Sequence, residues 1–216
     1  MSRVFQVVLL AALAPVTSRA QATGFEGAVS MTMQASGQTI PVDYEIKGHK
    51  ARLEMHTTGR TNVILIDLDA QTQTILIPEL KAFAVHSGEN PTTAGANTPP
   101  KVTDLGTTAS VAGYKCEQFK VETEKYSSVA CMTKQFGENP LTDTLSGPLH
   151  GALKGDDELR KAGMPLKVDV TFKEGGKQGE TASVEVTKVT PGPVDESQLG
   201  VPDGWHKLSG LPGMQQ

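Results

Sequence analysis

The two cysteines are the residues whose type and spacing point most clearly to chemistry. Cys116 and Cys131 lie near the two ends of the segment GYKCEQFKVETEKYSSVACMT, in which apolar and polar residues tend to alternate. This pattern predicts a β-hairpin that brings the two thiols together across its turn. In an oxidising compartment the thiols would form a structural disulfide. A bridge that closes a loop of about 15 residues stabilises a protein by roughly 3 kcal/mol.

The predicted hairpin also has a definite register. If Cys116 lies directly opposite Cys131, then Gln118 faces Val129, and Thr123-Glu124 form the turn. Three other interpretations of the thiols stay open. A redox-active pair normally has the closer Cys-x-x-Cys spacing, and the cysteines could also stay as free thiols or contribute half of a metal site. We favour the structural disulfide because each thiol then lies on its own strand of one hairpin.

Other candidate chemistry is weak in this sequence. The chain has no Gly-x-Ser-x-Gly, no His-Glu-x-x-His and no phosphate-binding glycine loop. Its five histidines are far apart in the sequence, which leaves clustering in space as the alternative. Asp67 and Asp69 lie at a predicted turn, where aspartate side chains hydrogen-bond the backbone, rather than at the spacing of a metal loop. We therefore predict a protein that is not an enzyme, with no catalytic residue, no metal site and no cofactor.

The N-terminus has the form of a secretory signal peptide. A basic start at Met1–Arg3 precedes an apolar stretch of twelve residues, and Ala20-Gln21-Ala22 is a small-x-small cleavage site. A membrane-spanning helix needs about 20 apolar residues, so an uncleaved anchor is the weaker alternative. We predict that residues 1–22 are removed, that no transmembrane segment remains, and that the protein is periplasmic or secreted. The lack of a cysteine at the cleavage site argues against a lipid anchor.

The charge of the mature chain restricts its partners. Removal of residues 1–22 takes away Arg3 and Arg19, which leaves 18 basic against 24 acidic residues, a formal net charge of −6. Nucleic acids and anionic membranes require a basic patch. We therefore predict no nucleic-acid partner, and the sequence gives no prediction of the oligomeric state.

The segments from residue 25 onward mostly alternate between apolar and polar residues, which is typical of strands with one buried and one solvent-exposed face. FEGAVSMTMQ and IPVDYEIKG are the clearest cases, and Gly37-Gln38 separates them as a turn. Strands that follow one another about every ten residues predict an antiparallel meander. The residues that we assign to the apolar face of these first two strands are Val29, Met31, Met33, Val42, Tyr44 and Ile46.

The alternation stops after residue 133 and resumes at residue 166. The segment between Lys134 and Gly163 carries leucines at irregular helical spacings, among them Leu145 and Leu149, and ends at a glycine and a proline. It predicts one or two short helices whose leucines cover an open face of the sheet as a lid. The remaining strands follow at 166–172 and 182–186. With about 194 mature residues, we predict one mainly β domain over residues 23–216.

The order of these segments resembles a known family. The hairpin VAGYKCEQFKVE, the second cysteine in VACMT, the strand GMPLKVDV and the closing LGVPDGW are similar to a family of secreted bacterial proteins defined as a domain of unknown function. That family is similar in fold to periplasmic lipoprotein carriers of the LolA/LolB kind. The resemblance implies a strongly curved antiparallel half-barrel with a helical lid, and a pocket that holds acyl chains.

Two functions agree with these features. The first is binding or shielding of a hydrophobic, acyl-like or lipid-like ligand in an apolar cavity. The alternative is a structural or protein-interaction module with a fully packed core and no ligand. Methionine adapts to variable apolar ligands but also fills cores. For the first function we expect the ligand to contact Val29, Met31, Met33, Val42, Tyr44, Ile46, Leu145 and Leu149.

Overall fold

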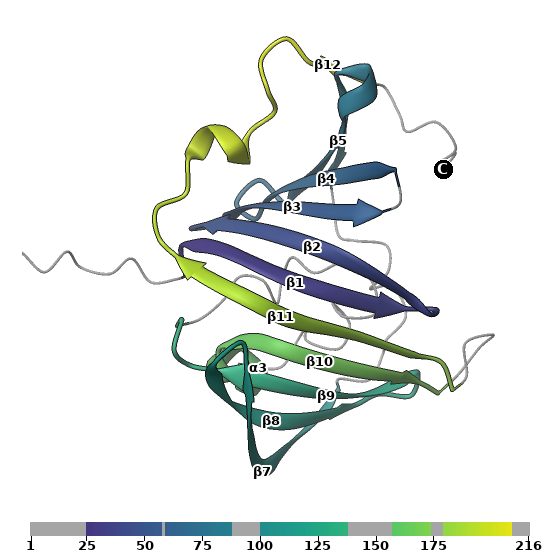
Figure 1. Cartoon of the computed structure of the whole chain (residues 1–216), viewed down its shortest axis with the longest axis vertical. Coiled ribbons are helices and arrows are strands. Elements are labelled where there is room, and N and C mark those ends of the chain that lie inside the picture. The colour runs from purple at the N-terminus through teal and green to yellow at the C-terminus, as the bar shows by residue number, and fades with distance from the viewer. Residues whose placement is uncertain (1–24, 58, 88–99, 138–156, 174–178, 209–216) are drawn as a thin grey trace, which may run out of the picture.

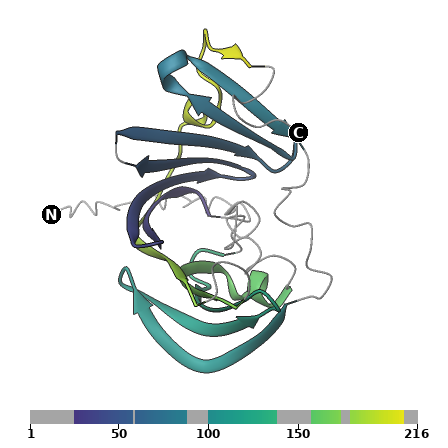
Figure 2. The ribbon, with the colours of Figure 1, turned by 90° about the vertical axis from the view of Figure 1, so that its right-hand side faces the viewer.

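The computed structural model describes residues 25–57, 59–87, 100–137, 157–173 and 179–208. In these residues twelve strands form one open sheet, which curves strongly (Figures 1 and 2). The strands are β1 (Gly27–Ala35), β2 (Gln38–Lys47), β3 (Lys50–Thr57), β4 (Arg60–Asp67), β5 (Thr72–Ile77), β6 (Ala82–Ser87), β7 (Lys101–Val111), β8 (Tyr114–Glu122), β9 (Tyr126–Thr133), β10 (Met164–Phe172), β11 (Thr181–Pro191) and β12 (His206–Lys207). The prediction of a mainly β protein with one curved sheet is confirmed.

The order of the strands across the sheet is β12-β6-β5-β4-β3-β2-β1-β11-β10-β9-β8-β7. Neighbours pair antiparallel, except that β12 runs parallel to β6. Alternation decides which side chains face inward, because successive residues of a strand point to opposite faces. Val29 pairs with Tyr44 and Met31 with Val42, so the predicted apolar residues of β1 and β2 lie side by side on the inner face.

Three irregularities in the ladder accompany the curvature. Thr187 is an extra residue of β11 opposite the Ser30–Met31 step of β1, and Leu166 is an extra residue of β10 opposite β9. The third lies in β7. Asp104 pairs with Phe119 and Thr108 with Glu117, so three residues of β7 lie opposite a single residue of β8. A bulge bends its strand and increases the local twist. All three irregularities therefore involve strands of the β7–β11 part of the sheet.

The strands β7–β11 form what we call the rolled half of the sheet. A small part of the edge strand β7 contacts β11, although three strands separate them in the sheet order. Aromatic rings pack at one end of this half. The ring centroid of Phe136 is 5.4 Å from that of Phe25 and 4.8 Å from that of Tyr114, both in edge-to-face geometry. Strands β2–β6, which we call the open half, make no comparable closure in the described residues (Figure 2).

The β8–β9 hairpin forms as predicted, but its register differs by two residues. Gln118 pairs with Cys131 rather than with Val129, so the turn is Glu124-Lys125 instead of Thr123-Glu124. The Thr123 hydroxyl accepts the N–H groups of Lys125 and Tyr126 at 3.2 and 3.1 Å. These bonds to a threonine side chain stabilise the turn where it forms.

The predicted insertion contributes one short helix to the described residues. Helix α3 (Asp157–Ala162) packs against β9, with Leu159 and Ala162 buried. It ends at Gly163, whose φ of +98° is unfavourable for other residues and where a Cβ atom would clash with the carbonyl of Thr133. Residues 138–156, with Leu145 and Leu149, lie outside the described residues.

The C-terminal segment crosses the outer face of the open half. After β11 it forms a 3₁₀ turn at Glu196–Leu199, and Val201 and Trp205 then pack on a small apolar cluster. The cluster consists of Val63, Leu65, Leu76 and the partly buried Phe83. The segment ends as β12, which pairs with β6. It therefore makes a second, smaller core on the side of the sheet opposite to the main one.

Candidate functional site

The candidate site is the inner face of the sheet, where apolar side chains continue from strand to strand. The ladder places Val29, Tyr44, Leu53 and Ile64 in one row across β1–β4. The neighbouring row contains Met31, Val42 and Met55. All of these side chains belong to one apolar cluster that extends through β8–β11. Alternation on each strand, together with the register, therefore produces one continuous apolar face.

Burial divides this face into two parts. Ile46, Tyr44 and Val29 are 0–1% exposed, and Met31 and Val42 are 5% exposed. Met33, by contrast, is half-buried, as are Leu53, Met55 and Ile64 further along the open half. The residues predicted to contact a ligand are thus mostly core residues. Half-buried apolar side chains lie on β1, β3 and β4 of this face, and others lie in the rolled half.

The structure brings six of the eight predicted ligand residues together, all on β1 and β2. Leu145 and Leu149 lie in the part of the chain that is not described. Sequence analysis did not assign Leu53, Met55 and Ile64 to the site. Leu53 and Met55 lie on an alternating strand, and that alternation was the available signal. Ile64 lies in a continuous apolar run, which does not distinguish the two faces of a strand.

In the rolled half the inner face is packed. Leu166, Val168 and Val170 of β10 are 0–2% exposed, and Phe119 and Val121 of β8 are 8% and 0% exposed. The only polar side chains among the buried described residues are Ser128 and Thr133, both on β9. Thr133 accepts the N–H of Gln135, whereas the Ser128 hydroxyl has no hydrogen-bond partner. This half therefore acts mainly as a hydrophobic core.

Several hollows open on the described surface, and two of them have linings rich in polar groups. One of about 480 Å³ lies between the β1–β2 turn and the ends of β10 and β11, and includes Gln34, Thr171, Thr181 and Ser183 in its lining. Another of about 290 Å³ lies beside the 3₁₀ turn and includes Glu45, Arg52, Glu54 and Gln198. Such linings suit water or polar groups better than acyl chains.

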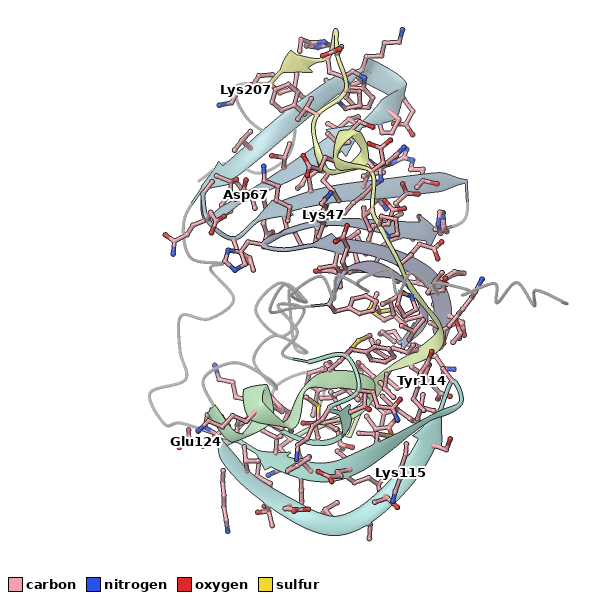
Figure 3. All side chains as sticks on the ribbon, turned by 90° about the vertical axis from the view of Figure 1, so that its left-hand side faces the viewer. Lys47, Asp67, Tyr114, Lys115, Glu124 and Lys207 are labelled. Atoms are coloured by element: carbon pink, nitrogen blue, oxygen red, sulfur yellow. A yellow bond between two sulfur atoms is a disulfide. The ribbon has the colours of Figure 1, made fainter. Side chains whose placement is uncertain are left out.

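Charged groups hold the C-terminal segment against the sheet. Lys47 donates to the carbonyl of Val194 at 3.3 Å and pairs with Glu196 at 3.0 Å and with Glu26 at 3.7 Å (Figure 3). The hydrogen bond that Lys47 donates to the Glu196 carboxylate is the largest of the effects that raise the pKa of Lys47 above its usual value of 10.5. Glu26 in turn accepts the N–H of Val194 at 3.0 Å. The segment is therefore fixed by charges at its start and by apolar packing at its end.

The disulfide between Cys116 and Cys131 is present, with the two Cα atoms 5.3 Å apart. Both residues are almost fully buried, at 1% and 3% exposure. A reactive cysteine normally lies in an accessible site, so burial supports a structural role. Disulfides persist in oxidising compartments, which indicates an extracytoplasmic protein.

The Asp67–Asp69 segment forms the predicted turn. The Asp67 carboxylate accepts the N–H of Ala70 at 2.9 Å, which is the main reason why its pKa lies below the usual 3.8. Asp69 pairs with His49 at 2.7 Å. No group of three or more His, Cys, Asp or Glu residues suited to a metal ion occurs in the part of the chain that is described. In the same part, no helix is long and apolar enough to span a membrane.

The fold and its site define a class of protein, namely a half-barrel made of one open, curved, mostly antiparallel sheet with an apolar inner face. Residues 25–205 match the family model "Domain of unknown function (DUF4412)", and the chain belongs to this family. This confirms the predicted membership in a family of unknown function.

Solved structures of similar fold exist. An uncharacterized conserved protein from Thermus thermophilus matches with a TM-score of 0.53 and 8% identity, over 84% of this chain and 88% of that one. MucB from Pseudomonas aeruginosa, in its complex with MucA, matches with a TM-score of 0.47 and 12% identity, over 86% of this chain and 61% of that one. At these identities the likeness concerns the fold alone. Comparison with curated protein sequences gave no significant match.

Proposed function

We propose that this protein is a non-enzymatic, exported binding protein that holds a hydrophobic, acyl-like ligand against the inner face of its sheet. One observation carries the proposal. The apolar face continues from the packed core into the open half, where Leu53, Met55 and Ile64 stay half-buried in the described residues. Contiguous apolar surface that solvent reaches is typical of ligand or partner sites.

The energy of such binding comes from the hydrocarbon that leaves water. Burial of each methylene group contributes about 0.8 kcal/mol, so a chain of several carbons laid along β3 and β4 gains affinity from length rather than from polar contacts. Met33 and Met55 are both half-buried on the apolar face, and flexible methionines adapt their shape to variable apolar ligands. In this arrangement Val29, Val42, Tyr44 and Ile46 form the floor of the site.

The remaining parts of the proposal concern the lid and the compartment. The leucine-bearing insertion, with Leu145 and Leu149, would cover the ligand from the solvent side. The mature protein would begin at Thr23, after cleavage of the signal peptide, and would be periplasmic or secreted. The buried disulfide supports an oxidising compartment.

Binding can be tested by titrating the delipidated mature protein with a fluorescent fatty acid. We expect saturable binding that Met55→Glu weakens at least tenfold, because a carboxylate would be placed on the apolar face. Thr61→Glu, on the adjacent strand β4, is the matched control. Asn62 pairs with Met55, so the preceding residue, Thr61, points to the opposite face of the sheet, where it is exposed. The control should bind as the native protein does. Equal effects of the two variants would contradict the assignment of the site to the inner face.

The alternative function is that of a structural or protein-interaction module. The burial of Val29, Tyr44 and Ile46 at 0–1% exposure favours it, because these side chains already have partners. If the native protein shows no saturable binding of fluorescent fatty acid or phospholipid, the interaction module replaces the carrier.

A further inference from the structure

The two edges of the sheet differ in how they are protected from pairing with another chain. An edge strand exposes unpaired N–H and C=O groups, and proteins protect such edges with caps, bulges or charges. At one edge, β12 covers the start of β6. The N–H groups of His206 and Leu208 donate to the carbonyls of Lys81 and Phe83 at 3.1 and 2.8 Å. At the other edge, β7 has no strand beyond it in the described residues.

The exposed edge strand β7 is long and has little charge in its second half. It has eleven residues, most of them exposed, and the segment Leu105–Val111 contains no charged side chain. Leu105 is 40% exposed and is one of two large hydrophobic residues that are exposed in the described chain. A straight strand of this composition would favour edge-to-edge association.

The bulge in β7 interrupts this strand at its centre. Asp104 pairs with Phe119 and Thr108 with Glu117, so Leu105, Gly106 and Thr107 oppose only Gln118. Gly106 has a φ of +63°, a conformation that glycine adopts at little cost. Its N–H donates to the Asp104 carboxylate at 2.8 Å, which closes the bulge.

A charge accompanies the bulge. By its pairing with the buried Phe119, Asp104 belongs to the row of β7 that faces the core, yet its side chain is exposed. A charged side chain at an inward position of an edge strand would be buried if a second sheet joined this edge, so it discourages such pairing. Lys101, at the start of the same strand, adds a second charge.

We propose that the Asp104–Thr108 bulge is a built-in block that prevents β7 from pairing with the β7 edge of a second copy of this chain. The partner that is blocked is a second copy of this chain, because antiparallel pairing of two β7 strands would place their uncharged segments opposite each other. The bulge bends each ladder at its centre and disrupts that pairing. This proposal is independent of ligand binding.

Removal of Leu105 and Gly106 tests the block directly. The deletion would leave Asp104, Thr107 and Thr108 opposite Phe119, Gln118 and Glu117, which restores a regular ladder and keeps the inward and outward faces unchanged. Thr107 already donates to the Gln118 side chain at 2.8 Å, so the new pairing retains an existing contact. We expect light scattering after size-exclusion chromatography to show a twofold increase in molar mass, and Thr108→Lys in the same background to return it to that of the native protein.

Two further variants complete the test. Leu105→Ser removes the exposed apolar side chain but keeps the bulge, and we expect its mass to equal that of the native protein. Asp104→Val removes the inward charge and the acceptor for Gly106, and we expect a concentration-dependent increase in mass even if the deletion variant does not fold. A native mass for both the folded deletion variant and Asp104→Val would overturn the proposal. So would a native dimer that Thr108→Lys separates, because the edge would then pair despite its bulge.

Discussion

The rolled half (β7–β11) and the open half (β2–β6) are built from the same kind of strand but end in different states. In the rolled half, bulges and the contact of β7 with β11 bring inward side chains such as Leu166 and Val121 to complete burial. In the open half, burial differs from place to place. Tyr44 and Ile46 of β2 are 0–1% exposed, whereas the inward Leu53 and Ile64 of β3 and β4 stay half-buried. Alternation therefore specifies which side chains face inward, whereas curvature specifies whether anything packs against them.

The largest expected difference between the halves is in stability. Leu166→Ala, in the rolled half, should lower the free energy of unfolding by about 2–5 kcal/mol, because a fully buried side chain leaves a cavity. Leu53→Ala, in the open half, should cost about 1 kcal/mol or less, because its side chain already contacts solvent. Urea unfolding of both variants measures the two values. Equal losses would contradict the division into a packed and an accessible part.

The disulfide should affect stability but not the ligand. Replacement of Cys116 and Cys131 by serine should lower the free energy of unfolding by roughly 3 kcal/mol, the value for a loop of this length. The affinity for fluorescent fatty acid should stay that of the native protein, because the disulfide lies in the rolled half. Chemical denaturation and ligand titration of the double variant test the two statements. If non-reducing peptide mapping of the native protein found two free thiols, both predictions would be wrong, because they assume the disulfide.

The C-terminal segment should stabilise the open half from its outer side. Trp205→Ala should lower the free energy of unfolding by about 1–2 kcal/mol, since the half-buried ring packs on the cluster of Val63, Leu65 and Leu76. Leu80→Ala is the control, because Leu80 is 57% exposed and its loss should change stability by less than about 0.5 kcal/mol. Hydrogen exchange should increase in β4–β6 of the tryptophan variant and stay unchanged in β8–β10. Uniform loss of protection would mean that the two halves unfold as one unit.

The smallest expected effect concerns pH at the β4–β5 turn. The folded-state pKa of Asp67 lies below its usual 3.8, so its contribution is present above about pH 4 and is lost as the pH falls through that lowered value. Asp67→Ala should therefore lower stability by about 1 kcal/mol at pH 7 and by much less at pH 2. Thermal melts at both pH values measure the difference. Asp69→Ala, whose ion pair with His49 is exposed, should have little effect at either pH.

The register of the β8–β9 hairpin shows what the apolar–polar alternation of a sequence can predict and what it cannot. The predicted register placed Cys116 opposite Cys131, and the observed one differs by two residues. Because side chains alternate with a period of two, a shift of two leaves every residue on the same face. The hydrophobic pattern therefore cannot distinguish the two registers. The bonds from the Lys125 and Tyr126 N–H groups to Thr123 identify the turn that forms.

For the candidate site too, the sequence predicted which face the residues lie on but not how exposed they are. Val29, Met31, Val42, Tyr44 and Ile46 were correctly placed on one apolar face, because alternation is a local property of each strand. Their exposure depends on what lies across the concave side, and those contacts come from segments far away in the sequence. This is why the accessible apolar residues Leu53, Met55 and Ile64 were not assigned to the site from the sequence.

The sequence by itself determined the mainly β class, the inward and outward faces of the first strands, the turn at Asp67–Asp69 and the pairing of the two cysteines. These features depend on neighbouring residues, on the period of a strand, or on the presence of only two thiols. The tertiary structure alone decided that one half of the sheet rolls up and the other stays open, that the C-terminal segment covers the outer face, and that β7 is an edge. Each of these depends on bulges and on contacts between residues distant in the chain, for which no local pattern exists.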